Sequence, residues 1–196
     1  MKRTTIAVCI LCMSFASLAG AEADIGFRGI GGKIGFVTPS DIDGTIMFGA
    51  FADLGTFAPQ VGFEANIDYW SSSESVGSIN FDFSDLAIGA RGKYLFEVQN
   101  EKWKPYAGGG LALHFVSSDI PAIGPFPGSS ETNTKIGLDF LGGTNFTVGK
   151  QVDIVGEAMF RMVSNIGQFA VYFGAIYWLG GGGEGEAGEA GDAGGK

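Results

Sequence analysis

The chain contains one histidine, His114, so any catalysis by a nucleophile and a base must be organised around it. Ser117 and Ser118 are the nearest hydroxyl side chains, and a serine beside a histidine is what a lipid hydrolase would need. Side chains on a strand alternate between two faces, so Ser117 lies on the face opposite His114. Ser118 shares the face of His114 but lies too far along the strand for a hydrogen bond. The pattern therefore does not predict an enzyme.

Metal or nucleotide binding is not indicated either. Both cysteines, Cys9 and Cys12, lie in the N-terminal apolar segment, and the acidic residues are spread along the chain, so no metal site is expected. The G-x-G-x-x-G spacing of dinucleotide-binding loops occurs only within the glycine-rich end of the chain, where a chance match is expected. The sequence therefore predicts no cofactor.

Charged residues recur at alternate positions of segments whose other positions are apolar, which is typical of strands with two unlike faces. The clearest case is Val61 to Trp70, with Glu64 and Asp68 on the face opposite Phe63 and Ile67. Two unpaired carboxylates could not be buried in an ordinary core, because each needs a partner. Taken together, the polar faces predict a shared polar interior, or lumen, formed by Lys33, Glu64, Asp68, Asp85, Arg91, Lys93, His114, Lys135, Asp139, Asp153, Glu157 and Arg161.

Eight such segments are separated by turn residues, and they predict an all-β fold. The expected strands cover residues 25–37, 45–54, 61–70, 81–96, 104–117, 134–148, 152–162 and 166–179. Two longer connections, Ser71 to Ser78 and Asp119 to Asn133, are expected to be loops. Phe81 and Phe83 are out of phase with the rest of the fourth segment, which indicates a bulge or a flared strand end there.

Two folds fit this pattern. In a soluble β-sandwich the apolar faces would form the core, whereas in a barrel in a lipid bilayer they would point outward and the charged faces inward. Aromatic residues near strand ends favour the barrel, because membrane interfaces are enriched in them. These residues are Tyr69, Tyr94, Phe96, Tyr177 and Trp178. Eight strands enclose an interior that side chains just fill, so the lumen could be a packed network of paired charges or a narrow pore.

The first residues have the three parts of a secretory signal peptide. Lys2 and Arg3 form the basic part, Ile6 to Leu18 the apolar part, and the small residues up to Ala23 a cleavage site. Residues 1–23 are therefore expected to be removed from the mature protein.

The mature chain is expected to be acidic. The whole chain has 12 basic and 21 acidic residues, and removal of Lys2, Arg3 and Glu22 leaves 10 and 20. This balance argues against nucleic acid as a partner. Residues 180–196, which contain nine glycines, cannot bury a core and are expected to form a disordered acidic tail.

Two stretches carry a family resemblance. Lys104 to Gly110, with the sequence KPYAGGG, and the last strand, in which Gly174 precedes Tyr177 and Leu179, resemble small outer-membrane β-barrels of the OmpA-like and opacity-protein type. The resemblance covers residues 24–179. It implies an eight-stranded antiparallel up-and-down transmembrane barrel with a polar interior, in a Gram-negative outer membrane, as a multi-pass protein with both termini in the periplasm.

The resemblance also implies partners and a role. The partners are outer-membrane lipid and the barrel-assembly machinery, which would read the last strand, although the tail puts that reading in doubt. Members of this superfamily serve as structural proteins, adhesins, weak channels or, occasionally, lipid-modifying enzymes. For this chain we expect a structural or surface-interaction role, with loops facing outside to meet an extracellular partner. The alternative is a small porin-like channel or transporter for ions or small solutes.

Overall fold

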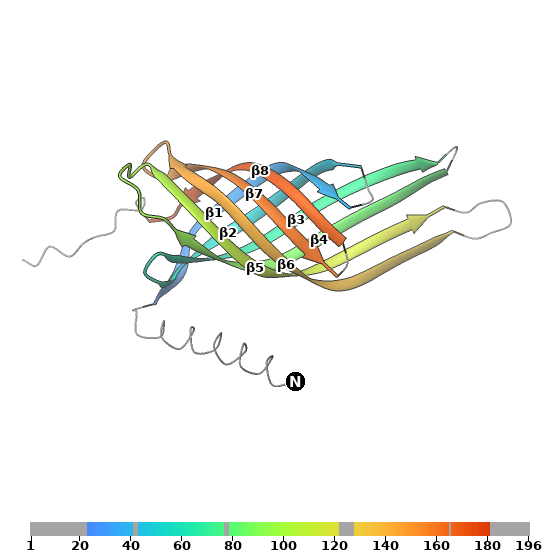
Figure 1. Ribbon diagram of the computed structural model, residues 1–196, viewed down its shortest axis with the longest axis horizontal. Helices are drawn as coiled ribbons and strands as arrows, with labels where there is room; N and C mark the ends of the chain where they lie inside the picture. Colours follow the sequence, from blue (N-terminus) through green and yellow to red (C-terminus); the bar gives the residue numbers. More distant parts are fainter. Residues whose placement is uncertain (1–22, 41–42, 77–78, 122–127, 165, 181–196) are drawn as a thin grey trace, which may run out of the picture.

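The computed structural model describes residues 23–40, 43–76, 79–121, 128–164 and 166–180. These residues are almost entirely in strands, which follow one another along the chain (Figure 1). The strands are β1 (Asp24–Pro39), β2 (Thr45–Ala58), β3 (Val61–Val76), β4 (Ile79–Leu95), β5 (Trp103–Ile120), β6 (Ser129–Thr147), β7 (Val152–Val163) and β8 (Ile166–Trp178). Within the described residues, no helix has the length and apolarity needed to cross a membrane.

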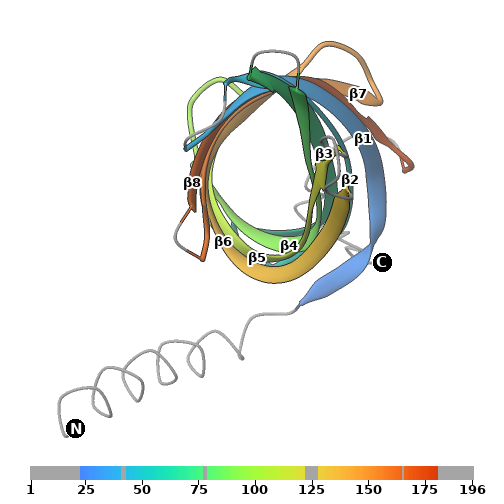
Figure 2. The same ribbon diagram turned by 90° about the vertical axis from the view of Figure 1, so that its right-hand side faces the viewer.

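The eight strands form one closed antiparallel barrel, in which each strand pairs with its neighbours in the sequence (Figure 2). The barrel is closed by β1 and β8, whose register runs without a shift from the pair Gly29–Trp178 to the pair Pro39–Gln168. The predicted fold class, and the predicted pairing of the last strand with the first, are confirmed.

The barrel has two unlike ends, the turn end and the hairpin end (Figure 1). At the turn end, residues 59–60, 96–102 and 148–151 join successive strands. At the hairpin end, the β3–β4 and β5–β6 hairpins continue beyond the other four strands, so one wall of the barrel is taller than the other.

Burial alternates along the strands as a barrel with unlike faces requires. In β7, Asp153, Glu157 and Arg161 are buried, whereas Ile154 and Phe160 are 49% and 45% exposed. In β7 the charged side chains therefore point into the barrel, and the side chains that point away from it are apolar.

Two connections are shorter than the sequence predicted. Ser71 to Val76, expected in a loop, continues β3 and pairs with β4 as far as Ile79. Asp119 and Ile120 likewise belong to β5, and residues 129–133 belong to β6. These segments are rich in serine and threonine and have no apolar face, so periodicity could not reveal them. Cross-strand pairing, rather than a local pattern, makes them strands.

Of the two explanations predicted for the change of phase at Phe81 and Phe83, a bulge or a flared strand end, the bulge is wrong. The pairing of β4 with β3 and with β5 keeps a single register through this part of the strand. Phe83 packs against the buried cluster that includes Met47 and Trp70. The change of phase arises because the polar and apolar faces of β4 exchange sides at the hairpin end.

Two of the predicted segments fall largely outside the described residues. Of the signal peptide, residues 1–23, the structure describes only Ala23, and of the tail, residues 180–196, only Gly180. Both remain predictions.

Candidate functional site

The interior of the barrel holds most of the charged residues that the sequence places on polar faces. Lys93 and Lys135 lie on the inward face but are partly exposed. The other ten predicted lumen residues are buried: Lys33, Glu64, Asp68, Asp85, Arg91, His114, Asp139, Asp153, Glu157 and Arg161.

Two arginines and two aspartates form the centre of this interior. Arg91 Nη2 donates to Asp68 Oδ2 at 2.8 Å and to Asp139 Oδ2 at 3.0 Å. Arg161 contacts the same two carboxylates, with Nη2 at 2.9 Å from Asp68 Oδ2 and Nε at 2.7 Å from Asp139 Oδ1. Asp68 and Arg91 lie on the paired strands β3 and β4, and Asp139 and Arg161 lie on the paired strands β6 and β7. The contacts therefore join two strand pairs across the lumen.

A second tier of charges lies on the side of the turn end. Lys33 Nζ is 3.2 Å from Glu157 Oε1 and 3.5 Å from Asp68 Oδ1. Lys93 pairs with Glu64 and lies 3.5 Å from Glu157 Oε2. Arg91 Nη1 joins the two tiers, at 3.4 Å from Glu157 Oε1.

The two tiers together, the central charge cluster, contain equal numbers of cations and anions. The four cations are Lys33, Arg91, Lys93 and Arg161, and the four anions are Glu64, Asp68, Asp139 and Glu157. Taking these ions out of water costs several kcal/mol each, and the cost is recovered only where each ion has close partners. The cluster therefore depends on its complete set of members.

Aromatic and sulfur-containing side chains fill the space around the central charge cluster. Tyr172 and Tyr106 lie under the ammonium groups of Lys33 and Lys93, at 4.3 Å and 4.6 Å from ring centre to Nζ. The Tyr106 hydroxyl donates to Glu157 Oε2 at 3.0 Å, and the Tyr172 hydroxyl contacts the sulfur of Met47. Arg91, Arg161 and Tyr172 are at most 1% exposed. At this level the interior is packed around Arg91, Arg161 and Tyr172.

Inward-facing glycines make room for the large interior side chains. A Cβ atom on Gly110 would lie 2.7 Å from Cγ of Arg91, and one on Gly49 would lie 2.5 Å from Oδ1 of Asp68. A Cβ atom on Gly137 would meet the His114 ring in the same way. Glycine on the inward face is thus the counterpart of a bulky partner on the neighbouring strand. These glycines are visible in the sequence, but the assignment of residues to strand faces did not use them.

His114 lies in a separate polar group nearer the hairpin end. Its Nδ1 is 2.8 Å from Asp85 Oδ2, and Gln168 Nε2 donates to the same oxygen at 3.3 Å. Ser117 points to the other face, where its hydroxyl lies 2.8 Å from Thr132 Oγ1. The structure therefore brings His114 to a carboxylate and not to a serine. Among the described residues, no group of three or more His, Cys, Asp or Glu side chains is placed to hold a metal ion.

The turn end of the lumen contains a third ion pair. Lys104 Nζ is 3.4 Å from Asp153 Oδ2 and 6.0 Å from the centre of the Trp178 ring. Trp178, predicted to be an interface aromatic residue, instead packs inside against the cluster of Phe51, Val155 and Ile176. The reason is its position on β8, since it shares the inward face of Tyr172 and Ile176.

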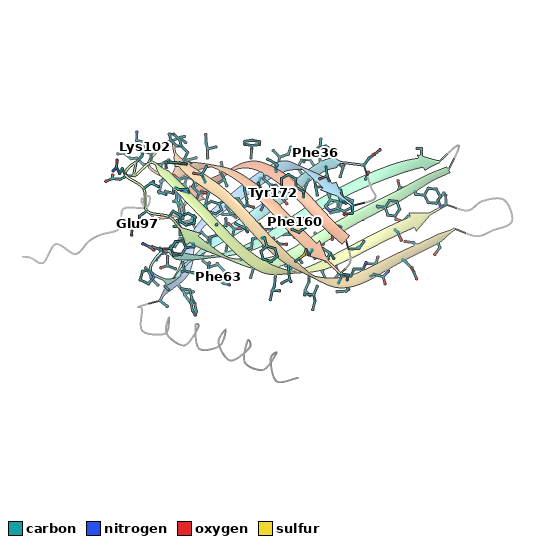
Figure 3. The ribbon with its side chains drawn as sticks, in the orientation of Figure 1. Phe36, Phe63, Glu97, Lys102, Phe160 and Tyr172 are labelled. Carbon is teal, nitrogen blue, oxygen red and sulfur yellow. The ribbon has the colours of Figure 1, made fainter. Side chains whose placement is uncertain are left out.

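The outer surface of the barrel is apolar, and the other four predicted interface residues lie on it. Tyr69, Tyr94, Phe96 and Tyr177 are 45–48% exposed. At the turn end, the hydroxyl of Tyr94 donates to Gln60 Oε1 and that of Tyr177 to Gln151 Oε1, at 2.6 Å and 3.0 Å. Figure 3 shows further outward rings, among them Phe36 and Phe160.

Several interior residues escaped the sequence analysis. Tyr106, Tyr172, Met47, Lys104 and Gln168 all contact the predicted charges, yet none was singled out as part of the lumen. Tyr172 and Met47 lie on strands whose two faces are both apolar, so alternation did not mark them as interior residues. Lys104 lies at the start of β5, where the alternation had not yet begun.

One protein family matches nearly the whole described barrel. The family described as "Outer membrane protein beta-barrel domain" matches residues 5–177. No curated protein sequence is a match at a significant level.

Solved structures show the same fold at low sequence identity. The crystal structure of Neisserial surface protein A (NspA) superposes with a TM-score of 0.62 at 21% identity, over 76% of this chain and 96% of that one. The attachment invasion locus protein Ail of Yersinia pestis, in complex with the heparin analogue sucrose octasulfate, superposes with a TM-score of 0.52 at 18% identity, over 78% and 99% of the two chains. At such identities the likeness concerns the fold alone.

Proposed function

Because this chain belongs to the family of outer membrane protein β-barrel domains and is a bacterial outer-membrane protein, we propose that it is a closed membrane anchor that presents its hairpin end to the outside of the cell. Its role in this proposal is structural support and surface interaction. Transport through the lumen is not part of it.

The outward apolar surface supports insertion in a bilayer. Ile30, Ile34, Leu111, Leu138 and Phe173 are each between 45% and 67% exposed. In water these side chains would form a very large apolar surface, whereas in hydrocarbon they are the expected lining. Closure of the barrel leaves no sheet edge in the bilayer, as a β protein in lipid requires.

The single observation that carries the proposal is the central charge cluster. Arg91 and Arg161 are at most 1% exposed, and each contacts a carboxylate on a distant strand. Arg91 of β4 contacts Glu157 of β7, and Arg161 of β7 contacts Asp68 of β3. A conducting path would have to separate these ion pairs, and an unpaired ion in this interior is costly. A packed, neutral lumen favours an anchor over a channel.

The orientation follows from the unlike ends of the barrel. Transmembrane barrels have short turns on the periplasmic side and longer connections outside. With eight strands, both chain termini leave the barrel at the turn end. We therefore place the turn end and both termini in the periplasm, and the hairpin end outside.

The partners follow from the same placement. Outer-membrane lipid covers the apolar surface, and the barrel-assembly machinery acts on β8, whose outward residues include Phe169, Val171 and Phe173. An extracellular partner meets the projecting hairpins.

A heparin-like ligand is not part of the proposal. Ail has been crystallised with a heparin analogue, and binding of such a polyanion needs a basic surface. Residues 34–90 and 105–134 of this chain contain no lysine or arginine. The hairpin end is thus unsuited to polyanions.

Conductance of the purified, folded protein in a planar bilayer tests the proposal. Folding is established first by a heat-dependent shift in gel mobility. We expect no reproducible ion current from the folded protein. A double variant, Arg91→Ser with Arg161→Ser, serves as the matched control, since it removes the two side chains that fill the centre of the lumen. Stable current steps from the unmodified protein would overturn the anchor proposal in favour of a channel.

A further inference from the structure

The projecting wall of the barrel ends in a sheet with unpaired sides. On β6, pairing with β5 begins at Ser129, opposite Ile120, whereas pairing with β7 begins only at Gly137, opposite Val163. Residues 129–136, the free β6 edge, therefore pair on one side only. Alternate backbone N–H and C=O groups of this edge point to a side on which the described residues provide no strand.

The free β6 edge is suited to accept another strand. None of residues 129–136 is a proline, so each of them has a backbone N–H. The segment is held straight by continuous pairing with β5 and by the contact of 2.8 Å between the hydroxyls of Thr132 and Ser117. An exposed, regular edge of this kind is a template for an extended peptide.

Side chains on the edge limit which peptides can pair with it. Glu131 and Lys135 stand on the inward-facing side of β6, and Thr132, Thr134 and Ile136 stand on the outward side. Charges on an edge discourage indiscriminate pairing with neutral or apolar strands. They also make pairing selective, because opposite charges on adjacent strands attract.

The charge around the edge is negative. Asp82 of β4 lies directly opposite Asp119 of β5, both on the outward face and both exposed, and Ser130 is next in the same row. Like charges in directly opposed positions destabilise a sheet. With Glu131 on the other face and no lysine or arginine in residues 105–134, both faces next to residues 130 and 131 favour a cationic neighbour.

We propose that the free β6 edge binds an extended, basic segment of a partner protein, which adds to the projecting sheet as an antiparallel strand beside β6. The proposal deepens the surface-interaction role and rests on the outward placement of the hairpin end. Backbone hydrogen bonds along residues 129–136 provide the pairing, and the carboxylates of Asp119 and Glu131 provide the preference for lysine or arginine.

The edge also defines a register for the incoming strand. A basic residue opposite Glu131 and an acidic residue opposite Lys135 would share one face, because these positions are four apart on β6. An apolar residue opposite Ile136 would lie at the edge of the apolar surface, since Ile136 is 68% exposed. The preferred partner segment is therefore basic towards the tip of β6 and acidic or apolar towards its base.

The edge of the projecting sheet on β3 is less suitable. On β3, pairing with β2 begins at Trp70, opposite Met47, so only Ser71 to Val76 pair on one side. The base of that edge is already engaged, because the Thr45 hydroxyl donates to the carbonyl oxygen of Ser71 at 2.8 Å. The longer β6 edge is the better binding position.

Peptide binding to the folded full chain in uncharged phosphatidylcholine nanodiscs tests the proposal. The probe is a fluorescent peptide as long as the edge. Lysine and threonine alternate in its C-terminal half, which lies beside the tip of β6 in an antiparallel strand, and its other half consists of threonine and valine. An acidic peptide with glutamate for lysine tests the charge, and a basic peptide with N-methylated alternate residues tests the hydrogen bonds. We expect the two comparison peptides to bind at least about tenfold more weakly, a loss of about 1.4 kcal/mol. Equal binding of the N-methylated peptide would reduce the interaction to charge alone and overturn strand addition.

Variants of the chain assign the interaction to β6. Glu131→Lys is expected to weaken binding of the basic peptide by about tenfold, and Glu101→Lys, which makes the same charge change at the turn end, is expected to leave it unchanged. Thr132→Pro and Asn133→Pro form a second pair. Successive amides of a strand point to opposite sides, so one of the two removes an N–H from the free edge while the β5 pairing stays intact. Binding that survives both proline variants overturns the assignment to β6.

The outcomes separate this proposal from the anchor proposal. Failure of the peptide to bind a folded, non-conducting barrel rejects strand addition and leaves the anchor role intact. Conductance by a barrel that binds the peptide rejects the closed lumen and leaves the edge assignment intact.

Discussion

The membrane-spanning part of β4 and its projecting part follow the same alternation with opposite chemistry. Between Leu95 and Asp85, the inward positions include Lys93 and Arg91, and the outward positions include Ile88. Beyond Asp85, the inward position is Phe83 and the outward positions are Ser84 and Asp82. The register does not change between the two parts. The same strand is thus polar on its inward face where its outward face is apolar, and polar on its outward face in the projecting part.

The bilayer placement proposed above accounts for this comparison, because each outward face carries residues suited to the solvent that would cover it. Where hydrocarbon covers the outer face, charges are tolerated only inside and only in pairs. Where water covers the outer face, charges and hydroxyls stand there without partners across a lumen. The predictions below test the difference between the two parts.

The largest expected effect is the loss of one member of the central charge cluster. Arg161→Met leaves Asp68 and Asp139 with fewer partners in the packed interior, and we expect the free energy of unfolding to fall by about 3–5 kcal/mol. Urea titration of folding into phospholipid vesicles, followed by gel mobility, measures this change. Glu131→Gln in the projecting part, at an exposed position, is the control and should change stability by less than about 0.5 kcal/mol. Similar losses for both variants would contradict the distinction between the two parts.

Arginine substitutions on the outward face of β5 should lower stability by different amounts in the apolar part and in the projecting part of this one strand. Leu111, which is 59% exposed, lies within the apolar surface, and Ser117 lies beyond it on the same face. Leu111→Arg is expected to cost about 2–4 kcal/mol and Ser117→Arg less than about 1 kcal/mol. The same vesicle-folding titration reports both. A small effect at Leu111 would mean that this position does not meet hydrocarbon.

Glycine substitutions should distinguish the inside of the barrel from the outside. A Cβ atom on Gly110 would lie close to Arg91, whereas one on Gly92 would meet nothing within 4 Å. Gly110→Ala is therefore expected to cost about 1–3 kcal/mol through overpacking. Gly92→Ala should be neutral or stabilising by up to about 1 kcal/mol. If the two alanine variants unfold at the same urea concentration, the fit of the interior around Arg91 is looser than described.

The smallest expected effect concerns the two opposed aspartates. Asp119→Asn removes a like charge from the position opposite Asp82, and we expect a gain of about 0.2–1 kcal/mol at low salt that shrinks as salt is added. Hydrogen exchange of the projecting hairpins is the measurement. Protection that falls in Asp119→Asn would indicate that the two carboxylates are not in repulsion.

The sequence revealed most of the barrel within the membrane and little of the projecting sheet. Alternation in segments such as Val61 to Trp70 sets which side chains face inward, and it correctly indicates closure by the last strand. It fails at residues 71–76 and 129–133, because hydroxyl-rich strands in water have no apolar face to reveal them. Pairing with a neighbouring strand, a contact distant in sequence, decides their structure.

The sequence predicted which charged residues form the candidate site, but not which of them contact one another. Periodicity places Glu157 and Arg161 on one face, but their partners come from β1, β3, β4 and β6. Trp178 was misplaced because its aromatic character was given more weight than its position on the inward face of β8. Pairing across a lumen depends on strand tilt and stagger, which single-strand patterns do not contain.

The central charge cluster has a consequence for assembly. The β3–β4 hairpin contributes Glu64, Asp68, Arg91 and Lys93 to the cluster, and the β7–β8 hairpin contributes Glu157 and Arg161. Each of these two hairpins therefore brings no net charge to the cluster. The β1–β2 hairpin brings only the positive charge of Lys33 to the cluster, and the β5–β6 hairpin brings only the negative charge of Asp139.

Two hairpins can therefore enter the bilayer without an uncompensated cluster charge, and the other two reach neutrality only when the whole cylinder comes together. The step that completes the barrel is thus also the step in which the charges of the central charge cluster become balanced. Completion of the barrel therefore depends on the formation of its ion pairs.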